Sequence, residues 1–295
     1  MSLRNILKGT GVAVVTPFNE DESIDYQSLD KTIDFLLDGG VNFLVILGTT
    51  GEASTIEYEE KVELINFVYN KVDGKVPIVV GVGGNNTKEV LKNLERLPLD
   101  KATSVLSVSP YYNKPSQEGL FQHYKLIAEN SPKPILLYNV TARTGRNLEA
   151  TTTIRLANEV ANIGGIKEAG GNFRQITEIL RRVPEDFLVT SGDDDLIIAQ
   201  MALGMDGVIS VAGNAFPNEM SGLVNHCLNN NFKEAKIIND KMINAYDLMF
   251  MENNPAGIKA FMNEKGLVKN ITRLPVVPVS ESLHQLIKDY LKNAQ

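Results

Sequence analysis

Eight short apolar runs recur along the chain, and segments of a different polarity pattern separate them. The runs are rich in Val and Ile and almost continuously apolar, which is typical of strands covered on both faces. We therefore expect eight strands, at residues 11–16, 42–48, 77–82, 104–109, 134–138, 163–167, 187–190 and 207–211.

The segments between these runs carry apolar residues at helical spacing. In the first segment, Leu29, Ile33 and Leu36 fall on one stripe. Strand–helix alternation repeated eight times predicts an α/β fold, a closed (β/α)8 TIM barrel, with an open doubly wound sheet as the alternative. Helices are expected at 25–37, 58–69, 87–97, 120–128, 149–160, 173–183, 194–204 and 217–229.

The pattern changes after the eighth unit. Residues 232–251, 255–264 and 281–292 read as three helices with no strand between them, and the two prolines in 273–278 indicate an extended linker. We expect two parts, a barrel over 1–230 and a C-terminal helical appendage over 231–295.

Composition narrows the classes of function. A length of 295 residues suits one α/β barrel, and the net charge of −7 argues against nucleic acid and acidic membranes as partners. The single cysteine, Cys227, excludes an internal disulfide framework and suits the reducing cytoplasm. No signal peptide is evident, and no apolar run approaches the roughly 20 residues that span a membrane.

One predicted strand carries a lysine among small and apolar residues, in the segment 162–171. Strand side chains alternate faces, so Lys167 points away from the carboxylate of Glu168. If that face lines a closed interior, burial favours the neutral amine, which can form a Schiff base with a carbonyl compound. The alternative is an ordinary surface lysine at a strand end.

Other strand ends carry residues suited to small anionic substrates. The hydroxyls of Thr49 and Thr50 suit a carboxylate, and Arg143 offers a forked donor for another. Tyr138 ends the strand before that of Lys167, where a phenol can pass protons. A plain turn and a solvated arginine are the alternative interpretations.

The remaining polar clusters favour no metal and no nucleotide cofactor. The acidic run 193–195 resembles a metal site, but no histidine is near it and it suits a helix start better. Neither a Rossmann glycine pattern nor a phosphate-binding loop is present.

Five strand ends in order resemble one family: Gly48-Thr-Thr-Gly-Glu52, Tyr111-Tyr-Asn-Lys-Pro115, Tyr138-Asn-Val140, Arg143-Thr-Gly145 and Gly165-Ile-Lys-Glu-Ala169. The chain is similar over nearly its whole length to the dihydrodipicolinate synthase family of pyruvate-dependent class I aldolases and lyases. That resemblance implies condensation of pyruvate with L-aspartate 4-semialdehyde to 4-hydroxy-tetrahydrodipicolinate, in the diaminopimelate route to lysine, with no cofactor.

The resemblance also implies roles for single residues. Lys167 forms the Schiff base, while Thr49 links the proton-carrying Tyr138 to Tyr112 in a relay. Arg143 receives the carboxylate of the second substrate. Pyruvate and its pocket are held by Thr50, Ile209 and Gly192.

The family further implies a homotetramer built as a dimer of dimers, in which Tyr112 completes the relay of a neighbouring copy. Lysine inhibits many members at the same interface, and a cationic Lys61 there predicts weak inhibition. Two departures from the family pattern are Thr141 in place of proline and Gly170 in place of Ser or Thr; we expect each to loosen the backbone beside the site. The positions that match the regulatory site are Ala53, Ser54, Tyr58, Lys61, Asn85, Glu89 and Tyr111.

Two other functions stay open at this point. Another pyruvate-dependent aldolase, such as N-acetylneuraminate lyase or a keto-sugar acid aldolase, would keep Lys167 and Tyr138 but suits Arg143 less well. A catalytically idle binding or regulatory barrel would be expected to lose the lysine or the tyrosine, and both are present.

Overall fold

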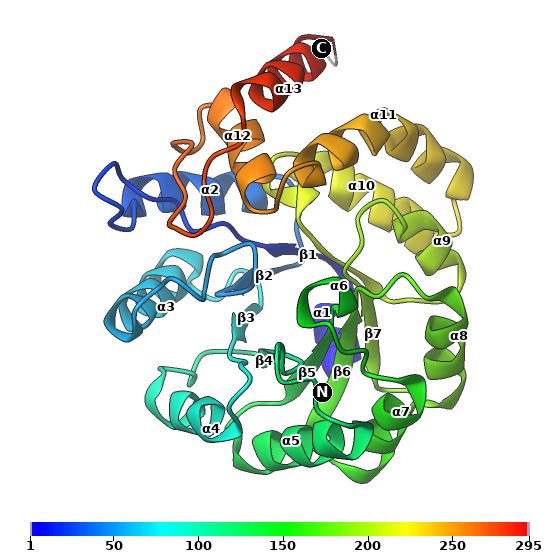
Figure 1. Ribbon diagram of the computed structural model, residues 1–295. Coiled ribbons are helices and arrows are strands. Elements are labelled where there is room, and N and C mark those ends of the chain that lie inside the picture. Colours follow the sequence, from blue (N-terminus) through cyan, green and yellow to red (C-terminus); the bar gives the residue numbers. More distant parts are fainter. Residues whose placement is uncertain (1, 294–295) are drawn as a thin grey trace.

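The computed structural model describes residues 2–293 and shows a closed barrel of eight parallel strands (Figure 1). Each strand pairs with the next in sequence, and the eighth pairs with the first, so the open-sheet alternative is wrong. The strands are β1 (Gly9–Ala13), β2 (Phe43–Ile46), β3 (Ile78–Gly81), β4 (Ser104–Val108), β5 (Ile135–Asn139), β6 (Ile163–Glu168), β7 (Leu188–Ser191) and β8 (Gly207–Ser210).

Helices surround the strands and follow the predicted periodicity. Several begin at residues that accept a hydrogen bond from the first turn, as Ser116 does from the backbone N–H of Gly119. All eight predicted helices between and after the strands are present. They are α2 (Tyr26–Asp38), α3 (Tyr58–Val72), α4 (Thr87–Arg96), α5 (Gln117–Asn130), α7 (Ala150–Glu159), α8 (Phe173–Arg182), α9 (Ile197–Ala202) and α10 (Pro217–Leu228).

Three short elements did not appear in the prediction: α1 (Leu3–Leu7), α6 (Thr141–Thr144) and the 3-10 turn η1 (Ala212–Asn214). Each spans five residues or fewer, which is too short to show an apolar stripe. The helix α1 lies at the amino ends of the strands, where Leu3 and Leu7 join the apolar cluster inside the barrel. An ion pair between Arg4 and Asp206, 2.8 Å from Nε to Oδ1, fastens it there.

The core has two apolar layers. A large cluster fills the space between the strands and the outer helices, and a smaller one, which includes Val45, Leu106 and Ile209, fills the barrel interior. Alternation of strand side chains between these layers explains why the strand sequences are almost continuously apolar.

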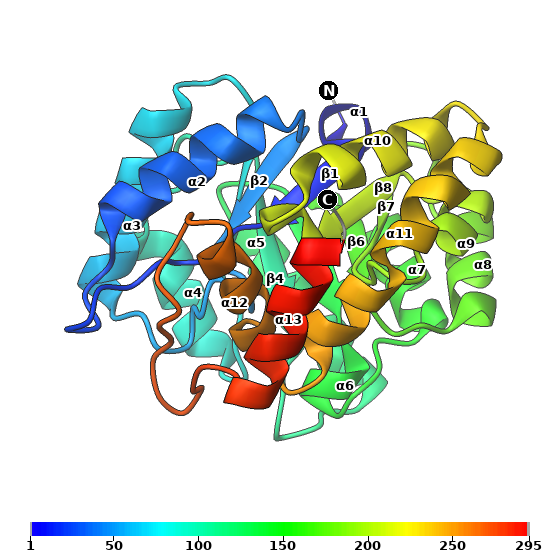
Figure 2. The ribbon, with the colours of Figure 1, turned by 90° about the horizontal axis from the view of Figure 1, so that it is seen from above.

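Residues beyond 230 form α11 (Phe232–Phe250), α12 (Ala256–Glu264) and α13 (Glu281–Asn293) (Figure 2). These three helices pack together, and α11 also packs against α10. The ammonium group of Lys259 forms a buried ion pair with the carboxylate of Glu52. This pair joins α12 to the loop after β2. Burial lowers the pKa of Lys259 to about 8, although Glu52 opposes the shift. The C-terminal helices are therefore anchored to the end of the barrel where the strands finish.

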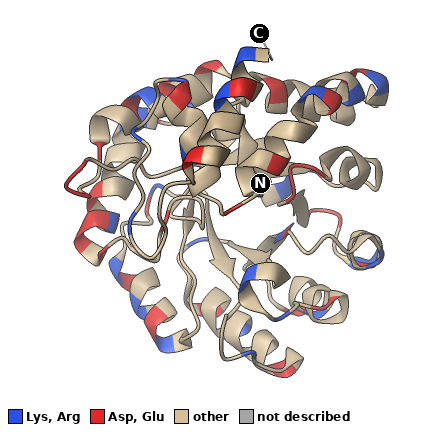
Figure 3. Ribbon diagram, turned by 45° about the horizontal axis from the view of Figure 1, so that its top comes forward, with Lys and Arg blue, Asp and Glu red and all other residues tan. Residues whose placement is uncertain are grey.

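Charged residues of both signs are interspersed over the outer helices (Figure 3). The Cys227 thiol is buried in α10, where burial raises its pKa to about 11. Within residues 2–293, no helix combines the length and the apolarity needed to cross a lipid bilayer.

Candidate active site

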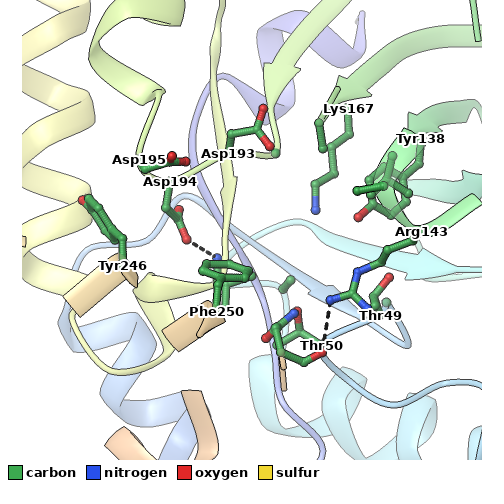
Figure 4. A pocket seen from close by; sticks show the side chains of 18 of the residues that line it. Thr49, Thr50, Tyr138, Arg143, Lys167, Asp193, Asp194, Asp195, Tyr246 and Phe250 are labelled. Atoms are coloured by element: carbon green, nitrogen blue, oxygen red, sulfur yellow. Dashed lines mark hydrogen bonds between the residues drawn. The ribbon is translucent and has the colours of Figure 1, made fainter. Parts of the chain in front are cut away.

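A cavity of about 700 Å³ opens at the carboxyl ends of the strands (Figure 4). Its inner wall is apolar and includes Ala13, Val45 and Leu106. The polar lining comes from the loops after β2, β5 and β7 and from the segment after α11. Catalytic residues of this fold lie at this end of the barrel.

Lys167 projects into the cavity from β6 and is only 4% exposed. Strand register places Tyr138 of β5 directly beside it, and the lysine Nζ lies 4.5 Å from the centre of the phenol ring (Figure 4). The predicted proximity of these two residues is confirmed. A buried amine can attack a carbonyl group, and a phenol beside it can transfer protons to and from the resulting adduct.

Gly192, after β7, makes room for the lysine side chain. A Cβ atom at this position would lie 2.7 Å from Cε of Lys167, so any larger residue would displace the amine. The backbone N–H of Gly192 donates to the carbonyl of Glu168 at 2.9 Å, which fixes the glycine against β6. Gly192 therefore shapes the cavity and also lines it.

Thr49 and Thr50 lie in the loop after β2, and both line the cavity. Thr50 is 2% exposed, and its hydroxyl accepts a hydrogen bond from Nδ2 of Asn254 at 3.1 Å. Glu52 ends the motif with a left-handed φ of 53° and is held by Lys259. The whole loop is thus fixed by residues of the C-terminal region.

Arg143 lies on α6, at the mouth of the cavity. Its side chain is exposed, and one guanidinium nitrogen donates to the backbone carbonyl of Asn254 at 3.1 Å. Gly145 ends α6 in the left-handed conformation, with φ of 67°. The departure Thr141 occupies the first turn of α6, a position that also accepts proline.

Two predicted site residues do not reach this cavity within one chain. Tyr112 is 90% exposed, with a left-handed φ of 71°, and does not line the cavity. Ile209 is fully buried in the inner apolar cluster below it.

The acidic run after β7 does not act as a helix start, so that interpretation is wrong. Asp194 instead accepts from the backbone N–H groups of Val211 and Ala212, at 2.9 and 2.8 Å, and so joins the loops after β7 and β8. Asp193 accepts from Nε2 of Gln200, and burial raises its pKa to about 6. Within residues 2–293, no group of three or more His, Cys, Asp and Glu side chains is arranged to hold a metal ion.

Behind β6, Glu168 forms the centre of a buried polar network that the sequence did not reveal. Its carboxylate accepts from Nδ2 of Asn139, Nε2 of Gln175 and the backbone N–H of Gly170, at 2.9 to 3.1 Å. Burial raises the pKa of Glu168 to about 7 despite these donors, and the like charge of Asp193 adds to the shift. This network ties β5 to β6 at the level of Tyr138 and Lys167.

The Gly170 departure lies beside the carboxylate of Glu168. A Cβ atom at this position would lie 2.7 Å from Oε1 of Glu168, and the φ of Gly170 is not in the left-handed region. Gly170 therefore leaves space beside the carboxylate, and the expectation of added backbone freedom stays a prediction.

A second cavity, of about 540 Å³, lies on the outer side of the loop after β2 and shares Thr49, Tyr138 and Arg143 with the first. At the edge of this second cavity, Asn85 donates to the backbone carbonyl of Tyr111 at 3.3 Å. Tyr58 and Glu89 do not line it: Tyr58 donates to the backbone carbonyl of Arg96, and Glu89 is exposed on α4. Of the predicted regulatory residues, those that line this second cavity are Ala53, Ser54, Lys61 and Tyr111.

The fold and the cavity together are those of a (β/α)8-barrel enzyme with a buried lysine and a phenol at the centre of its site. The chain belongs to the dihydrodipicolinate synthetase family, whose model matches residues 6–294. It is 46% identical over 286 residues to 4-hydroxy-tetrahydrodipicolinate synthase of Parabacteroides distasonis, covering 97% of this chain and 96% of the relative.

Solved structures of this family agree with the fold. A monomeric dihydrodipicolinate synthase variant is 38% identical with a TM-score of 0.95, covering 99% of this chain and 98% of that one. The chloride-inhibited dihydrodipicolinate synthase from Acinetobacter baumannii, complexed with pyruvate, is also 38% identical, with a TM-score of 0.94 and coverage of 98% and 99%.

Proposed function

We propose that this protein condenses pyruvate with L-aspartate 4-semialdehyde to 4-hydroxy-tetrahydrodipicolinate, the early step of lysine biosynthesis through diaminopimelate. The observation that carries the proposal is Lys167, buried in the cavity with its amine beside the ring of Tyr138. Membership of the family and the names of its relatives support the same reaction. The proposed place of action is the cytoplasm.

The chemistry follows from a primary amine that projects into a cavity open to a keto acid. The Lys167 amine adds to the keto carbon of pyruvate and water leaves, which gives an imine. Loss of a methyl proton gives an enamine, whose carbon attacks the aldehyde of the second substrate. The amino group of that substrate then displaces Lys167 and closes the ring, so the lysine is regenerated and no cofactor is consumed.

Tyr138 is the proposed acid and base for these proton transfers, because its phenol is paired with Lys167 from the neighbouring strand β5 and its ring lies beside the amine. Thr50, with its hydroxyl in the cavity wall, is proposed to bind the carboxylate of pyruvate. Arg143, exposed at the mouth, is proposed to receive the carboxylate of the semialdehyde.

Borohydride reduction in the presence of pyruvate tests the covalent step. We expect a reduced three-carbon adduct on Lys167, found by peptide mass spectrometry, and none in Lys167→Ala. Turnover assays with pyruvate and the semialdehyde, beside N-acetylneuraminate, test the substrate. An adduct on a different lysine, or faster turnover of the sugar acid, would overturn the assignment.

We further propose that the active form is a homo-oligomer, a dimer of dimers, in which Tyr112 and Thr49 extend the proton relay between copies. The support is the left-handed, 90% exposed Tyr112, which leaves a large ring in solvent in the single chain. Sedimentation at assay concentration tests this, and a fully active monomer would refute it. The existence of a monomeric variant among the similar structures makes this measurement necessary.

Lysine is the proposed inhibitor at the second cavity. Burial lowers the pKa of Lys61, which lines that cavity, while Glu57 and Glu60 oppose the shift. The ligand lysine carries ammonium groups of its own, and these would be repelled by the ammonium group of Lys61, so the proposed inhibition is weak.

A further inference from the structure

Asn254 connects the two residues that are proposed to receive the two substrate carboxylates. Its side-chain Nδ2 donates to the Thr50 hydroxyl at 3.1 Å, and its backbone carbonyl accepts from Arg143 at 3.1 Å. The residue is 4% exposed and lines the cavity between α11 and α12. It belongs to the C-terminal region, more than 200 positions away from Thr50 in the chain.

The direction of the first hydrogen bond determines what Thr50 can do. A threonine hydroxyl has one hydrogen to donate and lone pairs to accept with. Because Asn254 donates to the lone pair, the Thr50 hydrogen is free to point elsewhere, and Thr50 lines the cavity where a carboxylate would accept it. An acceptor in place of the amide nitrogen would take that hydrogen and turn the lone pairs toward the anion.

The two contacts of Asn254 use different groups. The contact to Thr50 depends on the side chain, whereas the contact to Arg143 depends only on the backbone carbonyl. Among residues 2–293 the other amide atom, Oδ1, has no hydrogen-bond partner. A side-chain substitution therefore removes the Thr50 contact and leaves the Arg143 contact in place.

We propose that Asn254 is a positioning residue for pyruvate, which acts by holding the Thr50 hydroxyl as a donor toward the pyruvate carboxylate. This inference rests on the proposed function, and it adds a residue from outside the barrel to the pyruvate site.

Two substitutions of nearly equal size separate this role from simple packing. Asn254→Leu removes the hydrogen bond, and we expect the pyruvate concentration for half-maximal borohydride trapping to rise about fivefold. Asn254→Asp accepts the Thr50 hydrogen and adds a negative charge beside the anion, so we expect a rise above about tenfold. The KM for the semialdehyde should change by less than about twofold in both variants, because Arg143 keeps its carbonyl partner.

Asn253→Asp is the matched control for charge. Asn253 is exposed, precedes Asn254 and also lines the cavity, but it does not contact Thr50. A rise for Asn253→Asp as large as that for Asn254→Asp would show that charge alone is responsible and would overturn the inference. Wild-type behaviour of Asn254→Asp would overturn it too, because the hydrogen bond would then run from Thr50 to Asn254.

A double-mutant cycle with Thr50→Val keeps the test decisive even if one variant is unstable. If Asn254 acts through Thr50, then Asn254→Leu should add no further rise in a Thr50→Val background. Additive effects, or equal losses for both substrates, would refute the inference. Borohydride trapping with pyruvate alone, without the semialdehyde, separates the two proposals. If wild-type Lys167 forms no adduct, the proposed function is rejected. If wild type forms the adduct and the Asn254 variants need no more pyruvate for half-maximal trapping, only this inference is rejected.

Discussion

The buried carboxylate of Glu168 should make the stability of this protein depend on pH, and Glu168→Gln should remove that dependence. Burial raises the pKa of Glu168 from 4.5 to about 7, because the neutral donors around it do not compensate for lost water. No cation is among the causes of the shift, and the one charge that acts, Asp193, repels it.

The direction of the pH dependence follows from whether the folded or the unfolded state binds the Glu168 proton more tightly. Between pH 4.5 and 7 the folded protein keeps the Glu168 proton while the unfolded chain loses it, so rising pH favours unfolding. The stabilising contribution is fully present below the unfolded pKa and is lost as pH rises through the folded pKa. A difference from 4.5 to about 7 corresponds to roughly 3 kcal/mol, most of it lost between pH 5 and 8.

Denaturant unfolding at pH 5 and pH 8, at one protein concentration, measures this contribution. Between these pH values the wild type should lose roughly 2–3 kcal/mol more unfolding free energy than Glu168→Gln does. The variant amide also faces the donor of Asn139, which lowers stability by about 1–3 kcal/mol at every pH, so the slope rather than the absolute value is the test. The control is Glu178→Gln, at a partly exposed position on α8 where the carboxylate pairs with Arg182, and it should keep the wild-type slope. Parallel curves for wild type and Glu168→Gln would refute the reasoning.

Three other outcomes follow from the structure. Lys259→Met should lower the free energy of unfolding by about 3–5 kcal/mol, because it leaves Glu52 buried without its cation, and adding Glu52→Gln should recover part of the loss. Denaturant unfolding of both variants checks this. A double variant less stable than the single one would contradict it. Gly170→Ala should lower stability by about 1–3 kcal/mol, since its Cβ meets Glu168, and an unchanged melting temperature would show that the network adapts freely. In a lysine titration of activity, half-inhibition should lie above ~1 mM. A residual repulsion of about 1.4 kcal/mol would make Lys61→Ala bind lysine about tenfold more tightly than wild type. Half-inhibition of wild type well below ~1 mM would show that the repulsion is negligible.

The strands could be predicted from the sequence because burial on both faces leaves a local signal, a short run of Val and Ile. The apolar runs 134–138 and 163–167 also predicted that Tyr138 and Lys167 lie side by side, because neighbouring parallel strands of a barrel end at the same level. Barrel closure could not be read in this way, because it depends on the pairing of β1 with β8 across almost 200 residues.

Residues that act through tertiary contacts left no local pattern. Asn254 stands between two helices in an ordinary polar stretch, and only the fold brings it to Thr50. Glu168 could be assigned to the face opposite Lys167, but its donors come from three different segments of the chain. The acidic run was misread for the same reason, since Asp194 binds backbone groups that follow a different strand.

The anchoring of the loop after β2 by Asn254 and Lys259 has a consequence for synthesis of the chain. These contacts join positions 204 and 207 residues apart, and such distant contacts form late, after the local strand and helix pairs. A ribosome that has completed all eight strands has therefore not yet supplied the groups that fix Thr50 and Glu52. The nascent barrel can collapse around its apolar core early, whereas its substrate pocket becomes rigid only once nearly the whole chain has emerged.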